Sequence, residues 1–290
     1  MSLRPITEDD FPAVVRLLAT DEEALYGRPS RLGLGDLREW LPRADLADDS
    51  WLWQEEGELR GVGWIDLHGG IGVLIGAVAV DWKGRGLGAT LLERAIARAT
   101  EKGAERMHGI ALGPDTAARQ LFLSRGFREV RRFYDMAIEL AEPPALPSLP
   151  VERFAEEDAE AFHAALDEAF RDHWEHHTTP FDEWWARHQS GPNFDPSLWF
   201  LIRDGDEIAA VTRNEGNRNG GGYIGAIGVR RAWRGKGYAK ALLLRSFREF
   251  FDRGMPRVTL GVDATNPTGA THLYERVGMH VEQEQVVFER

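Results

Sequence analysis

The chain of 290 residues contains no cysteine. This excludes disulfide bonds, a thiolate nucleophile, and zinc or iron–sulfur centres held by cysteine. Long apolar runs are also missing, because no stretch approaches the roughly 20 residues needed to cross a bilayer. Residues 1–5 do not form an apolar signal core, so the default expectation is a cytoplasmic protein.

Basic residues are fewer than acidic ones. The sequence has 35 Lys and Arg against 47 Asp and Glu, which gives a formal net charge of −12. A body this acidic repels phosphate backbones and anionic lipid at long range, so we expect no nucleic-acid partner and no membrane partner. The 43% hydrophobic and 28% charged residues are typical of a globular protein.

The sequence contains one unit twice. Residues 78–88 match residues 229–239 at an offset of 151, with a valine, a tryptophan and two glycines in common. Residues 121–127 match residues 273–279 at an offset of 152. A period near 150 is far longer than a solenoid repeat and indicates two copies of one domain.

The joint between the copies is predicted in the proline-rich segment 143–150, because proline disfavours both helix and central strand. This gives an N-terminal domain at 1–142 and a C-terminal domain at 151–290. Such a tandem can supply within one chain the pairing that single-domain proteins obtain by dimerising. We therefore expect a monomer or a weak homodimer.

Each copy is predicted to be an α/β unit in which an apolar strand enters a glycine-rich loop, and a helix and a further strand follow. In the second copy these elements are 223–229, 237–251 and 257–262. A strand, loop, helix and strand in this order form a βαβ crossover, so part of each sheet should be parallel. The ranges in the first copy are 71–80, 86–100 and 107–112.

The glycine-rich loop of the second copy lets the backbone approach an anionic ligand. Gly235 and Gly237 stand between a strand and a helix, whose first N–H groups carry the positive end of the helix dipole. Together these features predict a phosphate cradle. Four basic residues crowd this loop, as a pyrophosphate site requires: Arg230, Arg231, Arg234 and Lys236.

Two common phosphate motifs do not fit the loop. A P-loop has Gly-Lys-Ser/Thr, but here Gly237 follows Lys236. The dinucleotide fingerprint G-x-G-x-x-G fails because the spacing is two and two. The alternative is a glycine-rich turn that binds nothing and has solvated basic residues. This alternative is disfavoured because the loop occurs at the same depth in both copies. The glycine positions are Gly84, Gly86 and Gly88 in the first copy, and Gly235, Gly237 and Ala239 in the second.

Two segments of the second copy resemble signatures of the GNAT acetyltransferase superfamily. The signature Q/R-x-x-G-x-G/A is similar to Arg234-Gly235-Lys236-Gly237-Tyr238-Ala239. A second signature, with Asn, Ala, Leu-Tyr and Gly-Phe, is similar to Asn266, Ala270, Leu273-Tyr274 and Gly278-Met279. The tandem arrangement and the segment Phe170-Arg171-Asp172-His173-Trp174 resemble bacterial two-domain members related to mycothiol synthase.

The resemblance implies two tandem domains, each with a mixed, mostly antiparallel sheet that is flanked by helices and splayed at a parallel pair. It implies acetyl-CoA as the acyl donor and the primary amine of a small molecule or peptide as the acceptor. The pyrophosphate would lie on residues 235–239. Asn266 would contact the pantetheine arm, with a turn before Pro267 as the alternative. Pantetheine would pair, like an added strand, with Ile227, Gly228 and Val229.

The first copy departs from the family pattern. Lys83 replaces the usual Arg or Gln, although it can still meet phosphate as a point charge. Phe122 occupies the tyrosine position, and Pro114 and Asp115 stand where the Asn region should be. The corresponding candidate cofactor contacts are Val78, Lys83, Gly84, Arg85, Gly86 and Gly88.

Acetyl transfer to an amine needs a neutral amine, donors for the oxyanion, and a proton for the leaving thiolate. The family uses a tyrosine for that proton, and the matching residue is Tyr274; a core aromatic is the alternative. Phe122 has no proton to give, so we expect the chemistry in the C-terminal half and a degenerate N-terminal half. A non-catalytic acyl-CoA-binding or regulatory module is the alternative function, and a nucleotide-binding protein is a third.

The general base is not assigned, because the strand segment 223–227 has no carboxylate. Glu215 offers a water-mediated route, with a solvated hairpin glutamate as the alternative; deprotonation of the substrate amine by bulk water is a further one. The cluster at residues 173–177 has two His four apart, but the Glu does not follow the first His directly, as a zincin helix needs. We therefore expect no metal. By resemblance this region lines the acceptor pocket, which makes His173 and Glu175 candidate substrate contacts, with ordinary polar surface residues as the alternative.

Overall fold

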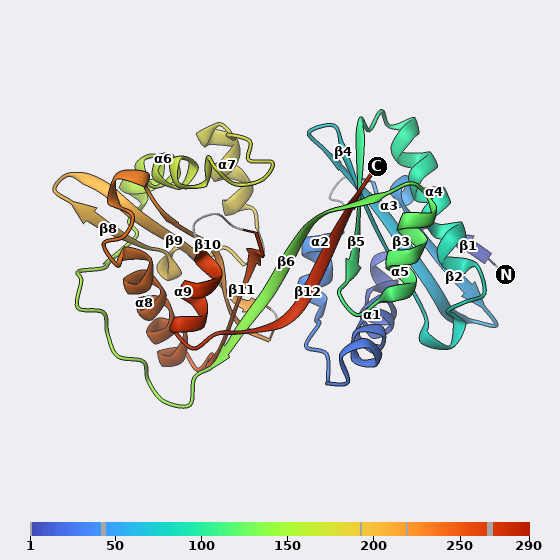
Figure 1. Cartoon of the computed structure of the whole chain (residues 1–290), viewed down its shortest axis with the longest axis horizontal. Helices are drawn as coiled ribbons and strands as arrows, with labels where there is room; N and C mark the ends of the chain where they lie inside the picture. The colour runs from blue at the N-terminus through green and yellow to red at the C-terminus, as the bar shows by residue number, and fades with distance from the viewer. Residues whose placement is uncertain (1, 42–44, 192, 219, 266–268) are drawn as a thin grey trace. The chain divides into compact units, whose positions relative to one another are not determined.

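The chain folds into two compact units, seen as two α/β bodies in Figure 1. Unit 1 comprises Met1–Phe133 and Gln283–Arg290, and unit 2 comprises Tyr134–Glu282. Each unit has a mixed sheet flanked by helices, which confirms the predicted fold of two tandem α/β domains. The computed structural model describes residues 2–41, 45–191, 193–218, 220–265 and 269–290.

Unit 1 holds a sheet with one parallel pair. Its elements are β1 (Ser2–Arg4), α1 (Phe11–Tyr26), α2 (Leu34–Trp40), α3 (Leu46–Asp49), β2 (Ser50–Glu55), β3 (Glu58–His68), β4 (Ile71–Val78), α4 (Leu87–Glu101), β5 (Arg106–Leu112) and α5 (Thr116–Ser124). Strands β1 to β5 lie side by side in sequence order. Among the described strands β1 to β5, only β4 and β5 run parallel, as the predicted crossover through α4 requires.

Unit 2 repeats this plan. Its elements are β7 (Glu152–Arg153), α6 (Ala159–Phe170), α7 (Phe181–Gln189), β8 (Phe200–Asp204), β9 (Glu207–Arg218), β10 (Gly221–Val229), α8 (Tyr238–Asp252), β11 (Arg257–Asp263) and α9 (Ala270–Arg276). Strands β7 to β11 again lie in sequence order, and β10 and β11 form the parallel pair.

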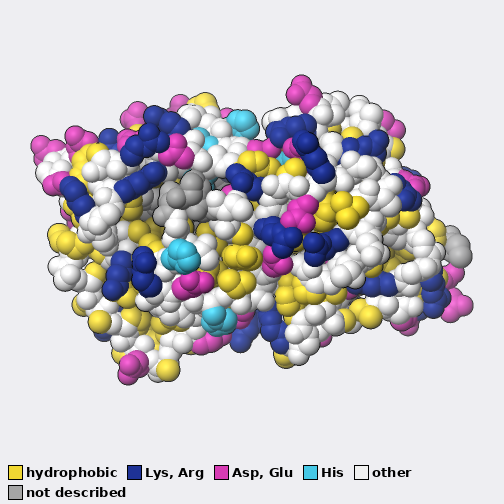
Figure 2. Space-filling view, viewed as in Figure 1, with side chains coloured by type: hydrophobic (Ala, Val, Ile, Leu, Met, Phe, Trp, Pro, Cys, Tyr) yellow, Lys and Arg dark blue, Asp and Glu magenta, His cyan; other side chains and the backbone are white. Residues whose placement is uncertain are grey.

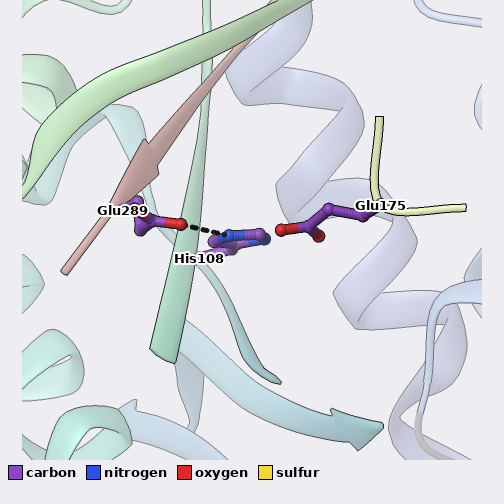
Figure 3. Close-up of side chains that lie close together, drawn as sticks. All are labelled: His108, Glu175 and Glu289. Carbon is purple, nitrogen blue, oxygen red and sulfur yellow. Dashed lines mark hydrogen bonds and ion pairs between the residues drawn. The ribbon is translucent and has the colours of Figure 1, made fainter. Parts of the chain in front are cut away.

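Two long strands, β6 (Arg128–Glu139) and β12 (His280–Glu289), contribute residues to both units. The end of β12 pairs with β5 of unit 1, and Glu289 stands opposite His108. The His108 imidazole lies 3.4 Å from the Glu289 carboxylate (Figure 3). The compact units therefore divide the chain differently from the ranges 1–142 and 151–290, because strand pairing rather than order along the chain decides which core a residue joins.

The two faces of the sheet in unit 2 carry different helices. Gly222 of β10 lies against α8, since a Cβ atom there would be 2.4 Å from the Phe250 ring. Asn214 of β9 donates to the Ser246 hydroxyl of α8 over 2.9 Å. Because successive side chains of a strand point to opposite faces, Tyr223 points away from α8. Figure 1 shows α6 and α7 on that other side of the sheet.

Among the described residues, no helix is long and apolar enough to span a membrane. On the face drawn in Figure 2, Lys and Arg side chains are interspersed with Asp and Glu side chains.

Candidate functional site

The glycine loops of the two units share one backbone conformation. Gly235 and Gly237 have φ values of 81° and 84°, and Gly84 and Gly86 have 80° and 87°. A side chain costs roughly 1–2 kcal/mol in this left-handed region, which explains the glycines. The second glycine of each pair is the N-cap of the following helix and offers no side chain to its first N–H groups. A Cβ atom at any of the four would meet nothing within 4 Å, so both loops face open space.

The parallel pair of unit 2 opens after Tyr223. Within the described strands, β10 and β11 are in register at Gly222–Val258 and Tyr223–Thr259. A β-bulge beside Gly225 follows in the pairing of β10 with β9, and bulges bend the strand that carries them. The strands therefore separate at this fork, as predicted for the splayed parallel pair.

The residues predicted to pair with pantetheine lie beyond the fork. Their partners on β9 occupy one edge of β10, and the other edge faces the opening. A Cβ atom at Gly228 would lie 2.7 Å from the Ala169 side chain, so glycine lets α6 approach the strand here. The predicted residues and their partners are Ile227 with Thr212, Gly228 with Val211, and Val229 with Ala210.

The basic residues of the unit 2 loop are paired with carboxylates. Arg234 donates to the carbonyls of Val229 at 3.3 Å and Ala169 at 3.2 Å, which ties the loop to α6. The predicted binding of phosphate at this loop would therefore depend chiefly on its N–H groups. The carboxylate pairs are Arg230–Glu168 at 2.7 Å, Arg231–Asp172 at 2.7 Å, Arg234–Asp172 at 3.6 Å and Lys236–Asp204 at 3.6 Å.

The remaining predicted cofactor contacts of unit 2 are divided between α8 and an undescribed segment. Tyr238 and Ala239 form the first turn of α8, directly after the N-cap Gly237. Asn266 lies outside the described residues.

Tyr274 is buried on α9, in the core that also holds Leu260 of β11. Burial raises the pKa of its hydroxyl to about 12, so the group keeps its proton at neutral pH. In unit 1 the matching Phe122 stacks on Phe288 at 5.3 Å and covers Gly109. Only the residue in unit 2 can therefore donate a proton.

The comparisons with known proteins agree with this geometry. The sequence model of the acetyltransferase (GNAT) family matches residues 11–127 and 159–279. The chain belongs to the GNAT acetyltransferase family. A mycothiol acetyltransferase from Thermobifida fusca is 29% identical over 74% of this chain and 73% of that protein. Its counterpart from Acidothermus cellulolyticus is 31% identical over 73% of this chain and 69% of that protein.

A solved structure also matches this chain along the whole of its 290 residues. The crystal structure of a GCN5-related N-acetyltransferase from Sphaerobacter thermophilus is 30% identical, with a TM-score of 0.88. The match covers 100% of this chain and 95% of that one. The chain is therefore an N-acetyltransferase, as predicted, and the family uses acetyl-CoA as its acyl donor.

The GNAT splay of unit 1 encloses a cavity of about 320 Å³ between β4, β5 and α4. Arg85, another predicted cofactor contact, is not among the residues that line this cavity. Its guanidinium donates to the Asp81 carbonyl at 3.2 Å and lies over the Trp82 ring at 4.8 Å. Phe122 also lines the cavity, so an acyl group bound there would meet no tyrosine hydroxyl at this position. The predicted cofactor contacts that line the cavity are Val78, Lys83, Gly84, Gly86 and Gly88.

Two carboxylates flank Lys83 at this cavity. Its ammonium forms ion pairs with Asp21 of α1 and with Asp115, at 3.3 Å, ahead of α5. Burial alone would lower the pKa of Lys83, but the two carboxylates outweigh it and raise the pKa. One feature of the sequence indicates this cluster. Asp21 follows Val14 and Leu17 at helical spacing, which places a carboxylate on the buried face of α1.

Replacing Lys83 by methionine should destabilise the protein at pH 7.5 by about 3 kcal/mol, because two partly buried carboxylates then face each other unpaired. Their repulsion disfavours the ionised carboxylates, and burial already raises the pKa of Asp21, so the penalty is present above that raised pKa and shrinks as pH falls through it. Urea unfolding at pH 7.5 and pH 4.5 measures this. An equal loss at both pH values would contradict the charge explanation.

His173, a predicted substrate contact, lies against the Phe170 ring, with the ring centroids 4.2 Å apart and the two planes tilted by 33°. Burial lowers the pKa of His173, and Asp263 and Arg234 are close enough to influence it. The fold therefore brings His173 near the glycine loop and the end of β11. Glu175 lies two residues on, in a turn where its φ is 55°.

Glu215 is not a solvated hairpin residue. Its carboxylate accepts from Arg213 and, over 2.9 Å, from Arg218. The ion pair lies over Gly225, where a Cβ atom would be 2.8 Å from Arg213 and 3.0 Å from Glu215. Burial would raise the pKa of Glu215, but the two arginines outweigh it and lower the pKa. A carboxylate held ionised in this way is a weak general base.

Proposed function

We propose that unit 2 transfers the acetyl group of acetyl-CoA to the primary amine of a small molecule or peptide. One observation carries the proposal: helix α9 has a tyrosine, Tyr274, at the repeat position where α5 of unit 1 has Phe122. The similarity to two mycothiol acetyltransferases supports a small-molecule acceptor.

Each part of the donor has a matching part of unit 2. The N–H groups at Gly235, Gly237 and the start of α8 bind the diphosphate. Pantetheine follows residues 227–229 along the open edge of β10. The acetyl thioester then lies toward the fork at Tyr223, and Tyr274 gives a proton to the departing sulfur.

For unit 1 we propose acyl-CoA binding without turnover. Its glycine loop has the same backbone conformation as that of unit 2, and its cavity of about 320 Å³ follows the splay. Phe122 supplies no proton, and the charge of Lys83 is shared with Asp21 and Asp115. Unit 1 would thus stabilise the protein with acyl-CoA bound and would not catalyse transfer.

The proposed function is tested by following thiol release from acetyl-CoA with a panel of primary amines: an amino sugar, an amino-acid ester, a polyamine and a short peptide. We expect release above the hydrolysis rate for at least one of them. Binding of CoA without turnover on any amine would instead favour the non-catalytic binding module.

A further inference from the structure

We propose that the acceptor of unit 2 carries a carboxylate beside its amine, as an amino acid does, and that Arg213 of β9 binds this carboxylate over Gly225. The inference rests on the proposed function of unit 2 and names the class of its acceptor. Arg213 is in this view a residue that determines specificity and takes no part in proton transfer.

The open stretch of β10 lies on the face of the sheet opposite α8. Tyr223 and Gly225 are both half-buried, whereas Gly222 is buried against α8. Further along the strand, α6 approaches at Gly228, which is also buried. The donor thioester is expected between Ile227 and the fork at Tyr223. An acceptor that attacks it from the open face would therefore lie over Gly225.

Arg213 lies on this same face, beside the bulge of β10. Its neighbour along β9, Asn214, bonds to Ser246 of α8, and because the side chains of a strand alternate, Arg213 points to the other face. A Cβ atom at Gly225 would be 2.8 Å from the Nη2 atom of Arg213, so the missing side chain lets the guanidinium lie on the strand. The Arg213 side chain is 17% exposed, which leaves it within reach of a ligand.

One nitrogen of the Arg213 guanidinium is held by Glu215. The Nη1 atom donates to this carboxylate, which also accepts from Arg218 over 2.9 Å. A guanidinium has more N–H donors than one carboxylate oxygen can accept. Within the described residues, Nη2 of Arg213 makes no hydrogen bond. Glu215 therefore orients the guanidinium and leaves its Gly225 side for an anionic group of the acceptor.

The other ionisable groups on this face place the anion over β10. Burial lowers the pKa of His188 of α7 to about 4, and the charge of Arg213 acts in the same direction, so Arg213 meets a neutral imidazole at pH 7. Asp135 lies on the far side of Tyr223, where its carboxylate is 3.7 Å from a Cβ atom built on Gly261 of β11. The positive charge thus lies over β10 and the acid over β11.

This anion position is separate from the diphosphate site of the donor. Gly225 precedes Val229, the last residue of β10, by roughly 13 Å along the strand, and the glycine loop lies beyond that end. A carboxylate suits the single nitrogen that Arg213 offers, whereas a phosphate presents more oxygens and more charge. In an amino acid, the amine and the carboxylate are bonded to one carbon. A carboxylate over Gly225 therefore holds the amine close to the thioester.

The test compares amino acids with their carboxamides, in which a neutral group of similar size replaces the carboxylate. The pairs are made from alanine, leucine, phenylalanine, serine, glutamate and lysine, and kcat/KM is measured by thiol release from acetyl-CoA. In Arg213→Gln, the ratio of acid to carboxamide should fall about 10- to 100-fold, the value of one charge-assisted hydrogen bond. The two amines of a pair differ in pKa, but this difference is the same for both proteins and cancels.

Arg203→Gln is the matched control. Arg203 of β8 is another partly buried arginine of unit 2, and it bonds to Glu152 at 3.1 Å and to Asp158 at 2.6 Å. This variant shows whether the loss of any such ion pair changes selectivity. We expect it to keep the acid-to-carboxamide ratio of the wild type, and an equal fall in both variants would overturn the inference.

A structural role of Arg213, or a role at the oxyanion, would lower the rate by the same factor with acids and carboxamides. That result, or an unchanged ratio, would also overturn the inference. If Arg213→Gln does not fold, Arg213→Lys takes its place. Lysine keeps the charge but loses the planar fork of donors, so the ratio should fall about 10-fold, and an unchanged ratio would count against the proposal.

A binding measurement separates this inference from the proposed function. Calorimetric titration of each acid and carboxamide into protein saturated with CoA reports acceptor binding without turnover. Carboxylate-dependent binding that is lost in Arg213→Gln, together with no thiol release on any amine, would refute the proposed function alone. Turnover with the same acid-to-carboxamide ratio in wild type and Arg213→Gln would refute this inference alone. The absence of both binding and turnover would refute both.

Discussion

Replacing Tyr274 by phenylalanine is expected to lower kcat by about 100- to 1,000-fold, the usual contribution of a positioned general acid. The ring would still fill the core around Leu260, so folding and the KM for acetyl-CoA should be nearly unchanged. Steady-state thiol release measures both parameters. The hydroxyl is active while protonated and loses its proton only as pH rises through about 12, so Tyr274 should add no alkaline limb to the rate profile near neutral pH.

Phe122→Tyr is the matched control for this result. It adds a hydroxyl at the equivalent position of unit 1, where the ring packs on Phe288 and Gly109. We expect it to leave turnover unchanged and not to rescue Tyr274→Phe. Full activity of Tyr274→Phe would remove the catalytic role of this tyrosine.

Replacing Gly237 by alanine is expected to raise the KM for acetyl-CoA by about 10- to 100-fold. The added methyl group would project into the open space in front of the loop, where the diphosphate would lie. Loss of one charge-assisted hydrogen bond, worth about 1.5–3 kcal/mol, corresponds to this change. Because φ is 84°, the variant should also lose roughly 1–2 kcal/mol of stability.

Gly86→Ala is the matched variant in unit 1. Its φ of 87° and its open surroundings predict the same loss of stability. Its KM for acetyl-CoA should remain at the wild-type value, because unit 1 is proposed not to turn over. The opposite pattern, with KM raised only by Gly86→Ala, would assign the chemistry to the N-terminal half.

The internal repeat made much of the fold predictable. The match between residues 78–88 and 229–239 placed a glycine loop after a strand and before a helix in each half, and the structure has both. The crossover predicted the parallel pairs β4–β5 and β10–β11. These features are local, because glycine spacing and apolar periodicity act within a few residues of one another.

The charges of the site were less predictable. The sequence around Gly235 has a local excess of positive charge. In the structure, however, each of these basic residues lies within 4 Å of a carboxylate from another element. The same holds for Lys83, whose partner Asp21 is 62 residues away. Ion pairs of this kind join distant segments, and a single sequence does not show which acid meets which base.

The sequence by itself determined that this protein is a doubled α/β chain with a glycine loop in each half and a tyrosine in only one. Tertiary structure alone decided that residues 283–290 complete the sheet of unit 1 and that Asp135 joins unit 2. The physical reason is that a β-strand is stabilised by the strand it pairs with. The position of a strand along the chain does not determine which strand it pairs with.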